Sequence, residues 1–497
     1  MPIADFSGQE PSIRPEAPRT HTPSPPPPTQ PLPDPPQPPR PAAEPAAYPD
    51  PHPRTHADAN PDPRRRPRTR ADANPDPRHG PRTRADACPG ALQVHEAADG
   101  ALARVRVPGG AISAAQLREL AACATELGSG VIELTSRANV QVRGLRSPDA
   151  FAARIAAAGL LPSAAHERVR NIVASPFGGR GPGGVLDPQP LVDALDRALC
   201  ADPHLAALPG RFLFAVDDGT GDVSGLGADV TYVPGHGLLL AGADGTLPGD
   251  ARTAPTLMTA AAAAFLAERT QDGRAAWRLA ELPDGATRLA ARLGLPLTDQ
   301  PPPGSGTGVR RGGVVRQGDG RVALEVLVPL GRLDGAQAVA IADVADTGAL
   351  VRLTPWRSVV LLDLDPGAAE DAARALGEAG LVTDPASPWA GVSACTGRPG
   401  CAKSLADVRE DARRWVATLD APPPTPVHWS GCERRCGLPR GQVTQIVATR
   451  DGYTVTGERH TTTDAHPQPP APGDPHTLAT SDERAAATSG GHQERHS

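Results

Sequence analysis

The segment Val105–Gln116 reads VRVPGGAISAAQ, and the segment Val326–Gln337 reads VLVPLGRLDGAQ. Each begins as an alternating strand that ends at a proline, and alternation of this kind is typical of half-buried strands. In the first copy Ser113 is suited to cap a helix over 114–127. We expect a helix after the second copy as well. The chain therefore contains the same strand–helix unit twice.

The repetition continues beyond this unit. A further strand segment, Val131–Leu145, contains LTSR at 134–137, and LTPW follows the second helix at 353–356. The offset between the copies is 221 residues before the helix and 219 after it, so a single two-residue deletion explains the change. Residues 170–175 align with 389–394 at the second offset. The duplication thus extends well past the first strand and helix.

We expect two α+β halves, 88–300 and 309–462, joined by a Pro/Gly-rich linker over 301–308. Strands in hairpin-like pairs alternate with helices, which favours antiparallel or mixed sheets with helices on one face. Ligands of such pairs usually bind between the halves. The ends, 1–87 and 463–497, are too poor in apolar residues to offset the entropy of ordering, and we expect them to be disordered.

The N-terminal end repeats a 14-residue unit, written PRTRADANPDPRHG at 67–80. The unit lacks an apolar face for stacking, so it is either an arginine-rich tether or an expanded repeat without a role. Neither a transmembrane helix nor a secretory signal is expected, and a cytoplasmic location follows. The net charge of −6 argues against general nucleic-acid binding. Seven cysteines are too few for a disulfide scaffold.

Four cysteines carry the strongest chemical signal. Their spacing is Cys395-x5-Cys401 followed by Cys432-x3-Cys436, in segments rich in glycine and proline. Four thiolates suit a zinc ion or an iron–sulfur cluster. Zinc favours tighter loops, whereas a wider loop with glycines lets backbone amides approach the sulfides of a [4Fe–4S] cluster. We favour the cluster, with zinc, disulfides or two unrelated cysteine pairs as alternatives.

This spacing, with Ser430-Gly431 before the third cysteine, resembles the [4Fe–4S] signature of the sulfite and nitrite reductases. Residues 135–144 resemble the tetrapyrrole-binding strand of that superfamily, and 170–172 resemble its second arginine motif. The resemblance covers 88–462. It implies an α+β, internally duplicated nitrite/sulfite reductase-like fold, with ferredoxin-like half-domains and cluster-binding α/β domains. It also implies a cluster beside a sirohaem, with the fourth cysteine bridging to the sirohaem iron.

Within that superfamily, the phrases CPGAL at 88–92, FLFAVDDG at 212–219 and CTGRPGC at 395–401 are most similar to the precorrin-3B synthase family. That similarity implies a monooxygenase that hydroxylates the tetrapyrrole precorrin-3A with O2 and closes a γ-lactone, a step of cobalamin biosynthesis. It implies a mononuclear non-haem iron beside the [4Fe–4S] cluster and an electron donor, NADH or a ferredoxin-type reductase. No nucleic acid or membrane partner is expected. The sequence identifies neither the iron ligands nor a catalytic residue.

Two departures separate the chain from the reductases. Reductases carry an Arg-Lys-x-Lys run after a Leu-Pro, whereas 208–211 read LPGR, and Arg434 stands where reductases have an asparagine. Reduction of an oxyanion needs several cations to bind it and deliver protons, and a hydroxylase acting on a macrocycle does not. A sirohaem-dependent sulfite or nitrite reductase is the alternative. A metal-stabilised, non-catalytic tetrapyrrole chaperone is a third interpretation.

A precorrin bears many carboxylates, which arginine binds bidentately. Alternation along one strand would place the polar residues of 137–143 on one face, opposite apolar neighbours. A solvated sheet face and ordinary surface arginines are the alternative explanations. The candidate substrate-binding residues are Arg137, Asn139, Gln141, Arg143, Arg170 and Arg211.

Other polar residues lie near the motifs. We expect His428, just before the third cysteine, to support the cluster by a hydrogen bond rather than to bind iron. Lys403, near the expected start of a helix through Trp415, would raise the cluster potential, pair with a substrate acid or simply lie on the surface. Asp217-Asp218 would either give a carboxylate to iron or form an ordinary turn.

Overall fold

The computed structural model describes residues 86, 88–241, 245–271, 274–298 and 312–456. The chain divides into two units, 1–74 and 75–497, and the first lies outside the described residues. The expected linker and the 14-residue unit at 67–80 also fall outside them. Both expected disordered ends do so as well, apart from Asp86. In the part of the chain that is described, no helix is long and apolar enough to cross a membrane.

Two antiparallel five-stranded sheets each contain one edge strand from the other half of the duplication. The first has the order β1-β2-β5-β4-β15 and the second β13-β14-β17-β16-β3. The borrowed strands, β15 and β3, pair with β4 and β16. The first sheet contains β1 (His95–Ala97), β2 (Gly100–Val105), β4 (Val131–Leu134), β5 (Val140–Leu145) and β15 (Arg332–Asp334). The second contains β3 (Ala111–Ile112), β13 (Gly313–Arg316), β14 (Val322–Leu327), β16 (Leu350–Leu353) and β17 (Ser358–Leu364).

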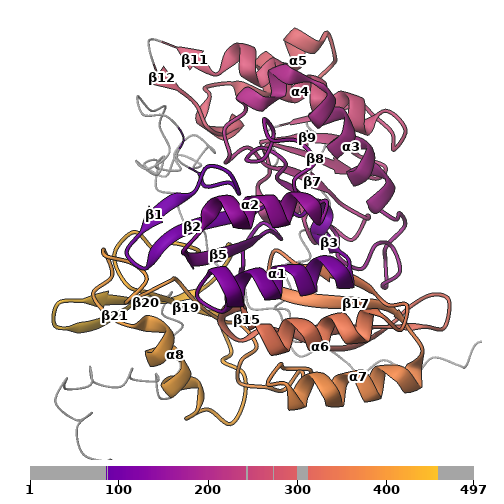
Figure 1. Cartoon of the computed structure of the whole chain (residues 1–497). Helices are drawn as coiled ribbons and strands as arrows, with labels where there is room; N and C mark the ends of the chain where they lie inside the picture. The colour runs from indigo at the N-terminus through magenta and orange to yellow at the C-terminus, as the bar shows by residue number, and fades with distance from the viewer. Residues whose placement is uncertain (1–85, 87, 242–244, 272–273, 299–311, 457–497) are drawn as a thin grey trace, which may run out of the picture. The chain divides into compact units, whose positions relative to one another are not determined.

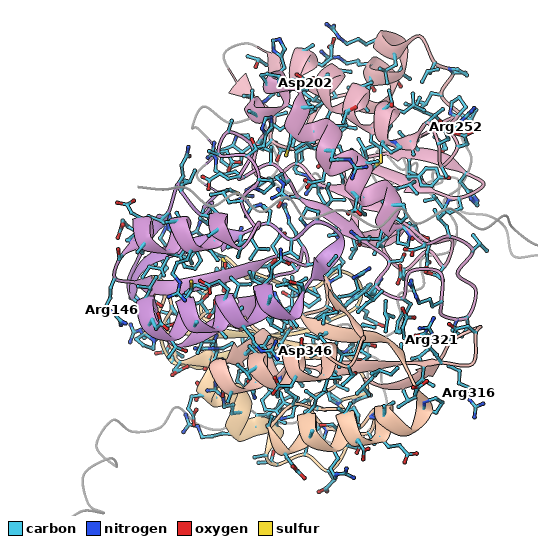
Figure 2. All side chains as sticks on the ribbon, turned by 45° about the vertical axis from the view of Figure 1, so that its right-hand side comes forward. Arg146, Asp202, Arg252, Arg316, Arg321 and Asp346 are labelled. Atoms are coloured by element: carbon cyan, nitrogen blue, oxygen red, sulfur yellow. The ribbon has the colours of Figure 1, made fainter. Side chains whose placement is uncertain are left out.

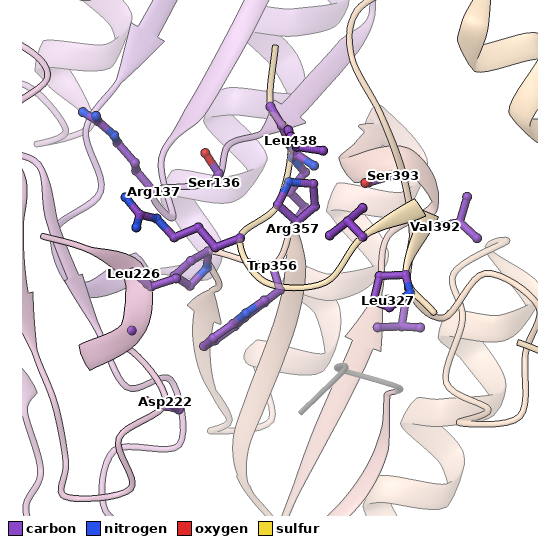
Figure 3. Close-up of a pocket in the computed structure, with 18 of the residues that line it drawn as sticks. Ser136, Arg137, Asp222, Leu226, Leu327, Trp356, Arg357, Val392, Ser393 and Leu438 are labelled. Atoms are coloured by element: carbon purple, nitrogen blue, oxygen red, sulfur yellow. The ribbon is translucent and has the colours of Figure 1, made fainter. Parts of the chain in front are cut away.

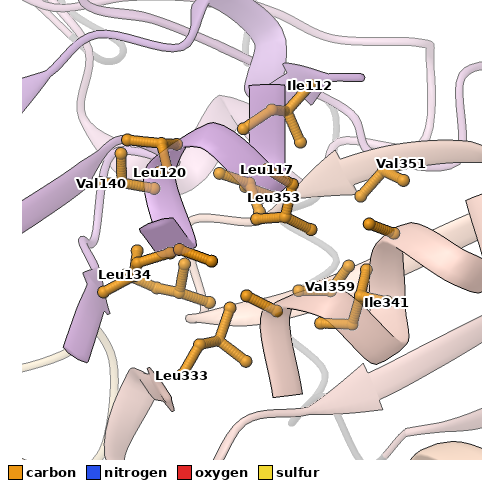
Figure 4. Packing of buried hydrophobic residues seen from close by; sticks show 14 of the residues in the cluster. Ile112, Leu117, Leu120, Leu134, Val140, Leu333, Ile341, Val351, Leu353 and Val359 are labelled. Carbon is orange, nitrogen blue, oxygen red and sulfur yellow. The ribbon is translucent and has the colours of Figure 1, made fainter. Parts of the chain in front are cut away.

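The helices of these two sheets share one core. They are α1 (Ala114–Leu127) and α2 (Pro148–Ala157) in the first half, and α6 (Gly335–Ala345) and α7 (Pro366–Glu378) in the second. Figure 1 shows α1 and α6 side by side, and they are in contact. Leu117 and Leu120 of α1 meet Leu333 and Ile341 of the second half in a single apolar cluster (Figure 4). Exchange of edge strands and a shared core therefore join the halves that the sequence repeat defines.

The start of both core helices has the same capping geometry. The Ser113 hydroxyl accepts the Gln116 N–H at 3.1 Å, and the Gln116 side chain accepts the Ser113 N–H at 3.1 Å. Asp334 and Gln337 repeat this exchange at 2.8 and 3.1 Å. Reciprocal bonds of this kind satisfy two backbone donors that a helix start otherwise leaves without partners.

Alanine at either cap is expected to lower the free energy of unfolding by about 1 kcal/mol, because one helical N–H loses its acceptor. Chemical denaturation of Ser113→Ala and Asp334→Ala measures this. The exchange variants Ser113→Asp and Asp334→Ser are the controls, since each keeps an acceptor at the cap, and they should stay within about 0.5 kcal/mol of the parent. Alanine variants as stable as the parent would contradict the role of the caps.

Each half also contributes a mixed sheet. The third sheet runs β10-β9-β8-β7-β6 and the fourth β18-β19-β20-β21, with the three strands β6 to β8 and the three strands β18 to β20 in parallel. The third contains β6 (Ile172–Ala174), β7 (Phe214–Val216), β8 (Val230–Val233), β9 (Gly237–Leu240) and β10 (Gly245–Leu247), with α3 (Gln189–Ala201), α4 (Ala254–Glu268) and α5 (Gly285–Leu293). The fourth contains β18 (Val392–Ala394), β19 (Val427–Ser430), β20 (Thr444–Thr449) and β21 (Gly452–Thr456), with α8 (Val408–Val416). A small hairpin pairs β11 (Thr270–Gln271) with β12 (Arg274–Ala275).

Two local expectations differ from the structure. The single strand expected over Val131–Leu145 is wrong, because the chain turns between β4 and β5 and Ala138 has a φ of 55°. Arg137 and Asn139 therefore lie in a turn and do not share a strand face with Gln141 and Arg143. The helix expected from near Lys403 begins later, at Val408. Asp407 sets that start by accepting the Glu410 N–H.

Candidate functional site

The four cysteines follow two neighbouring parallel strands. Cys395 and Cys401 come after β18, and Cys432 and Cys436 come after β19. Because β18 and β19 pair in parallel, their carboxyl ends share one edge of the sheet and the two cysteine loops lie together there. The N–H of Gly431 donates to Sγ of Cys395 at 3.2 Å. The sheet thus joins the two loops.

The donor set fits an iron–sulfur cluster. All four cysteines are free thiols. Burial raises the pKa of Cys436, and Cys395, Cys432 and Cys401 raise it further, so the four thiols lie within electrostatic reach of one another. In a cluster each thiolate binds a different iron, which compensates this repulsion.

A mononuclear iron has less support. Among the residues that the structure describes, no three His, Cys, Asp or Glu side chains, the four cysteines included, are grouped as the ligands of one metal ion. The structure therefore does not identify a ligand set for the non-haem iron that the sequence resemblance implies. Asp217, one candidate, instead accepts the backbone N–H groups of Gly219 and Gly221 at 2.8 and 2.9 Å, as the turn interpretation expects.

Gly431 has no room for a side chain. A Cβ there would lie 1.8 Å from Oγ of Ser404. The N–H of Leu405 donates to the Gly431 carbonyl at 2.8 Å, which brings the two cysteine loops together a second time. Glycine is therefore required where the backbone amide approaches the Cys395 sulfur.

His428 supports the second cysteine loop. It is fully buried, with Nδ1 2.9 Å from Oγ of Ser393 and Nε2 3.2 Å from the Cys436 carbonyl. Burial, with a smaller contribution from the charge of Arg357, lowers the pKa of His428 to about 3, so the ring is neutral. A carbonyl only accepts, so we assign the proton to Nε2, and Nδ1 accepts from the Ser393 hydroxyl. Both ring nitrogens are used in holding the loop.

One arginine from each half holds one cysteine loop. Arg143 of β5 forms two 2.8 Å bonds to Asp99 and donates from Nη2 to the Gly400 carbonyl at 2.5 Å, next to Cys401. Arg357, which follows β16, donates from Nη2 to the Gly437 carbonyl at 3.0 Å. The duplicated sheets therefore position both loops of the cysteine site.

A cavity of about 360 Å³ lies beside the second cysteine loop. Figure 3 shows Arg137, Trp356 and Arg357 on its wall with Ser393 and Leu438, which adjoin the cysteine segments. Both ferredoxin-like sheets and both mixed sheets contribute segments to the lining. The cavity thus lies between the two halves, where the duplication led us to expect a ligand. Its main lining segments are 136–137, 225–226, 355–357, 391–393 and 437–440.

Two matching turns, one from each half, reach this cavity. The Thr135 hydroxyl accepts the N–H groups of Arg137 and Asn139 at 3.3 and 3.1 Å. The Thr354 hydroxyl accepts those of Trp356 and Ser358, both at 3.2 Å. A threonine hydroxyl that accepts backbone bonds in this way defines a tight turn. The matching LTSR and LTPW phrases therefore place Arg137 and Trp356 at equivalent positions of the duplicated fold.

The cavity carries more positive than negative charge. Four arginines line it, against one acid, Asp222. Arg278 is paired with Asp229 at 2.7 Å, but Arg137, Arg357 and Arg440 have no carboxylate within ion-pair distance among the described residues. Burial and then the charge of Arg278 lower the pKa of Arg137 to about 10. Burial also lowers the pKa of Arg357 and of Arg440.

Arg137, Arg278 and Arg357 are half-buried, whereas Arg440, at the rim of the cavity lining, is exposed. Figure 2 shows Arg146, Arg252, Arg316 and Arg321 at the surface, and all four are exposed. A charge that folding takes out of water needs a partner, because the desolvation cost is otherwise large. The unpaired arginines of the cavity therefore favour an anionic ligand.

Of the six candidate substrate-binding residues, Arg137 lines the cavity and the other five do not. Asn139 accepts the Val107 N–H at 2.9 Å through Oδ1, and Gln141 donates to Glu133 at 2.6 Å. Arg143 holds the first cysteine loop, as described above. Contact of these residues with a ligand stays a prediction.

Arg170 and Arg211 also have other partners. Arg170 forms bonds of 2.7 and 2.6 Å to the two carboxylate oxygens of Asp196. The Arg211 side chain is exposed, and its guanidinium lies 5.1 Å from the centre of the Trp277 ring, within cation–π distance. Lys403 is exposed, as its surface interpretation expects.

Among the lining residues that the sequence candidates did not include are Trp356, Arg357, Arg278 and Arg440. The match of LTPW to LTSR is a signal for the first, because an equivalent position of a duplication faces the same interface. Arg278 and Arg440 lie outside any repeated or periodic segment. Nothing in the sequence distinguishes them from surface arginines.

Both copies of the duplicated sheet match one known domain family. The model of the nitrite/sulfite reductase ferredoxin-like half domain matches residues 95–155 and 314–379. The two matches fall on the two copies of the repeat. Together the two matches contain all the strands of the two five-stranded sheets except Gly313, the first residue of β13, so the expected fold class is confirmed.

The relatives do not all have the same named activity. The chain is 28% identical to sulfite reductase [ferredoxin] 1 of Mycolicibacterium paratuberculosis over 415 residues, 71% of each chain. It is 27% identical to precorrin-3B synthase of a Sinorhizobium species over 388 residues, 74% of this chain and 81% of that one. The solved structure of Mycobacterium tuberculosis NirA superposes with a TM-score of 0.60 at 26% identity, over 71% of this chain and 73% of that chain.

Proposed function

We propose that this protein is an oxidoreductase that acts on a carboxylate-bearing tetrapyrrole in the manner of a precorrin-3B synthase. The reaction would be O2-dependent hydroxylation of precorrin-3A with γ-lactone formation. The observation that carries the proposal is the cavity beside the second cysteine loop, where Arg137, Arg357 and Arg440 have no carboxylate partner among the described residues. Its volume lies within the usual range for ligand sites.

The lining suits a flat, anionic macrocycle. Two of the chain's five tryptophans, Trp356 and Trp389, line the cavity and offer apolar ring surface. Arginine guanidinium groups around them would bind the carboxylates at the macrocycle edge bidentately. Several such contacts fix the orientation of the macrocycle, and orientation is what selects one meso carbon and one neighbouring acetate for lactone closure.

The cysteine site would supply electrons. A [4Fe–4S] cluster held by Cys395, Cys401, Cys432 and Cys436 transfers electrons one at a time when bound. The chain's contribution is to hold the two loops through Arg143, Arg357 and His428. The segments that flank these loops, 391–393 and 437–440, line the cavity. The electron donor in this proposal is NADH through a reductase, or a ferredoxin-type protein.

The placement of Arg211 supports the oxygenase over a reductase. It is the one cation left in the stretch that holds several in reductases, and it stacks on Trp277 outside the cavity lining. A second candidate is nevertheless a sirohaem-dependent sulfite or nitrite reductase. It is supported by relatives of that name at similar identity, and sirohaem is itself a polycarboxylate that the same arginines would bind.

The test is to purify the protein without oxygen, record its absorption spectrum and supply precorrin-3A, O2 and a reductant. We expect cluster absorbance without sirohaem bands, and a product that mass spectrometry identifies as the hydroxylated lactone. Retained sirohaem with consumption of sulfite or nitrite would overturn the oxygenase in favour of the reductase. Zinc without iron, and no reaction with any of these substrates, would favour the non-catalytic chaperone.

Replacement of Arg137 by methionine is expected to weaken tetrapyrrole binding by about 10- to 100-fold, because one charge-assisted bond is lost. Equilibrium binding followed by the absorbance of the macrocycle measures this. The control is Arg316→Met, the same change at an exposed arginine of β13, which should bind like the parent. Equal affinities of Arg137→Met and the parent would show that the macrocycle binds elsewhere.

A further inference from the structure

Arg357 touches two sites at once. Arg357 lines the cavity, and its Nη2 donates to the carbonyl of Gly437, which is the residue after Cys436. Both environments are tight around it. A Cβ on Gly331 would lie 2.7 Å from Cδ of Arg357, and one on Gly437 would lie 2.6 Å from Nη2. The backbone of Arg357 itself has a φ of 63°, an unfavourable value for a side-chain-bearing residue that the surrounding turn enforces.

This side chain lacks a strong partner. Among the described residues the bond to Gly437 is its one side-chain hydrogen bond, and no carboxylate lies within ion-pair distance. Burial lowers the pKa of Arg357, and the charge of Arg409 lowers it further. A carboxylate reaching Arg357 from the cavity would form an ion pair, with the option of two parallel bonds, which the neutral Gly437 carbonyl cannot offer. The ligand would therefore compete with the cysteine loop for one guanidinium.

The charge of Arg357 also acts on the cysteine site. The guanidinium of Arg357 and the thiolate of Cys395 attract each other. This attraction raises the pKa of Arg357, whereas burial lowers it. A positive charge near a cluster stabilises the reduced, more negative form, and neutralising that charge removes the stabilisation.

We propose that Arg357 couples occupancy of the cavity to the redox state of the cysteine site. A ligand carboxylate pairs with Arg357, weakens its bond to Gly437 and cancels its charge, so the reduction potential of the cluster falls when the macrocycle binds. The bound state is thereby the stronger reductant, and electrons leave the cluster preferentially when substrate is present. This inference rests on the proposed function, since it needs both the cluster and a carboxylate-bearing ligand.

Thermodynamic linkage allows the coupling to be measured either as a change in reduction potential on ligand binding or as a change in ligand affinity on reduction. If binding lowers the potential, reduction must weaken binding by the same free energy. We expect the dissociation constant of a stable polycarboxylate tetrapyrrole, uroporphyrin, to be about tenfold larger for the reduced protein, which corresponds to a potential shift of about 59 mV for a one-electron couple. The potential is followed by the electron paramagnetic resonance signal of the cluster during a redox titration.

The decisive variant is Arg357→Met, with Arg137→Met as its matched control. Both remove one unpaired arginine of the cavity, but Arg137 makes its side-chain bond to the Gly210 carbonyl, away from the cysteine loops. Without ligand, the cluster of the Arg357→Met protein should have a lower reduction potential than that of the parent. The Arg357→Met protein should also bind uroporphyrin equally well in the reduced and the oxidised state, so that the ratio of the two dissociation constants is close to one. Arg137→Met should bind more weakly in both states and keep the parental ratio. If Arg357→Met loses the cluster, Arg357→Lys carries the same comparison, with a ratio between those of Arg357→Met and the parent.

The outcomes separate this inference from the proposed function. An Arg357→Met protein with its cluster intact and the parental ratio and potential would overturn the coupling while leaving the function standing. A ratio that collapses equally in Arg137→Met would overturn it too, because general cavity charge would then be the cause. Failure of the parent to bind uroporphyrin would overturn both the coupling and the tetrapyrrole cavity on which the function rests.

Discussion

Replacing Cys432 by serine is expected to give a folded protein with almost no iron and almost no acid-labile sulfide. The cluster needs four thiolates, and a serine hydroxyl does not replace one of them at neutral pH. The polypeptide should persist, because the Leu405 N–H holds the Gly431 carbonyl and Arg357 holds that of Gly437 independently of any thiol. Parent protein purified without oxygen should contain about four irons and four sulfides per chain.

Cys200→Ser is the control for this substitution. Cys200 is a half-buried thiol on α3 and belongs to neither cysteine loop. Its replacement should leave iron, sulfide and the visible spectrum at parental levels. A Cys432→Ser protein with parental iron and sulfide would contradict the four-cysteine assignment, and zinc in place of iron in the parent would support the zinc alternative.

Replacing Asp196 by alanine is expected to lower the free energy of unfolding by about 3–5 kcal/mol, because it leaves the Arg170 charge buried without its partner. The pair is well shielded, with side-chain exposures of 6% for Arg170 and 19% for Asp196, and both carboxylate oxygens accept from the guanidinium. Chemical denaturation followed by circular dichroism measures the change.

The double variant Arg170→Met with Asp196→Leu tests the role of Arg170 itself. Apolar replacement of both partners of a buried ion pair is often close to neutral, so the double variant should recover most of the stability lost by Asp196→Ala. If Arg170 is purely structural, the double variant will also bind tetrapyrrole like the parent. Restored stability with lost binding would instead support the sequence prediction that Arg170 contacts the substrate.

The duplication shows how much of the fold the local sequence pattern predicts. Strand, proline and helix recur in the sequence, and the structure repeats them as two half domains with matching caps at Ser113 and Asp334. The same pattern could not predict that β3 and β15 exchange sheets. Each is an edge strand of two or three residues, and which sheet it joins depends on packing between the halves.

The site shows where residue type fails as a guide. Arginine bears the same formal charge everywhere, but Arg143 and Arg170 are neutralised by Asp99 and Asp196, whereas Arg357 has no carboxylate partner in the part of the chain that the structure describes. Pairing depends on which acid the fold brings within about 4 Å, a distance that the interval along the chain does not determine. Arg137 could be predicted because it lies within 135–144, the stretch that resembles the tetrapyrrole-binding strand of the sulfite and nitrite reductases.

Cysteine spacing, helix capping and the repeated strand–helix segment are local properties of the chain. The sequence by itself therefore determined the cysteine loops, the capped helices and the duplicated fold class. Only the tertiary structure decided which arginines line the cavity, because side chains separated by hundreds of residues meet there. It also placed Arg357 between the cavity and the loop of Cys436. The physical reason is that burial and charge pairing are properties of the assembled interior, where desolvation makes an unpaired charge costly and therefore informative.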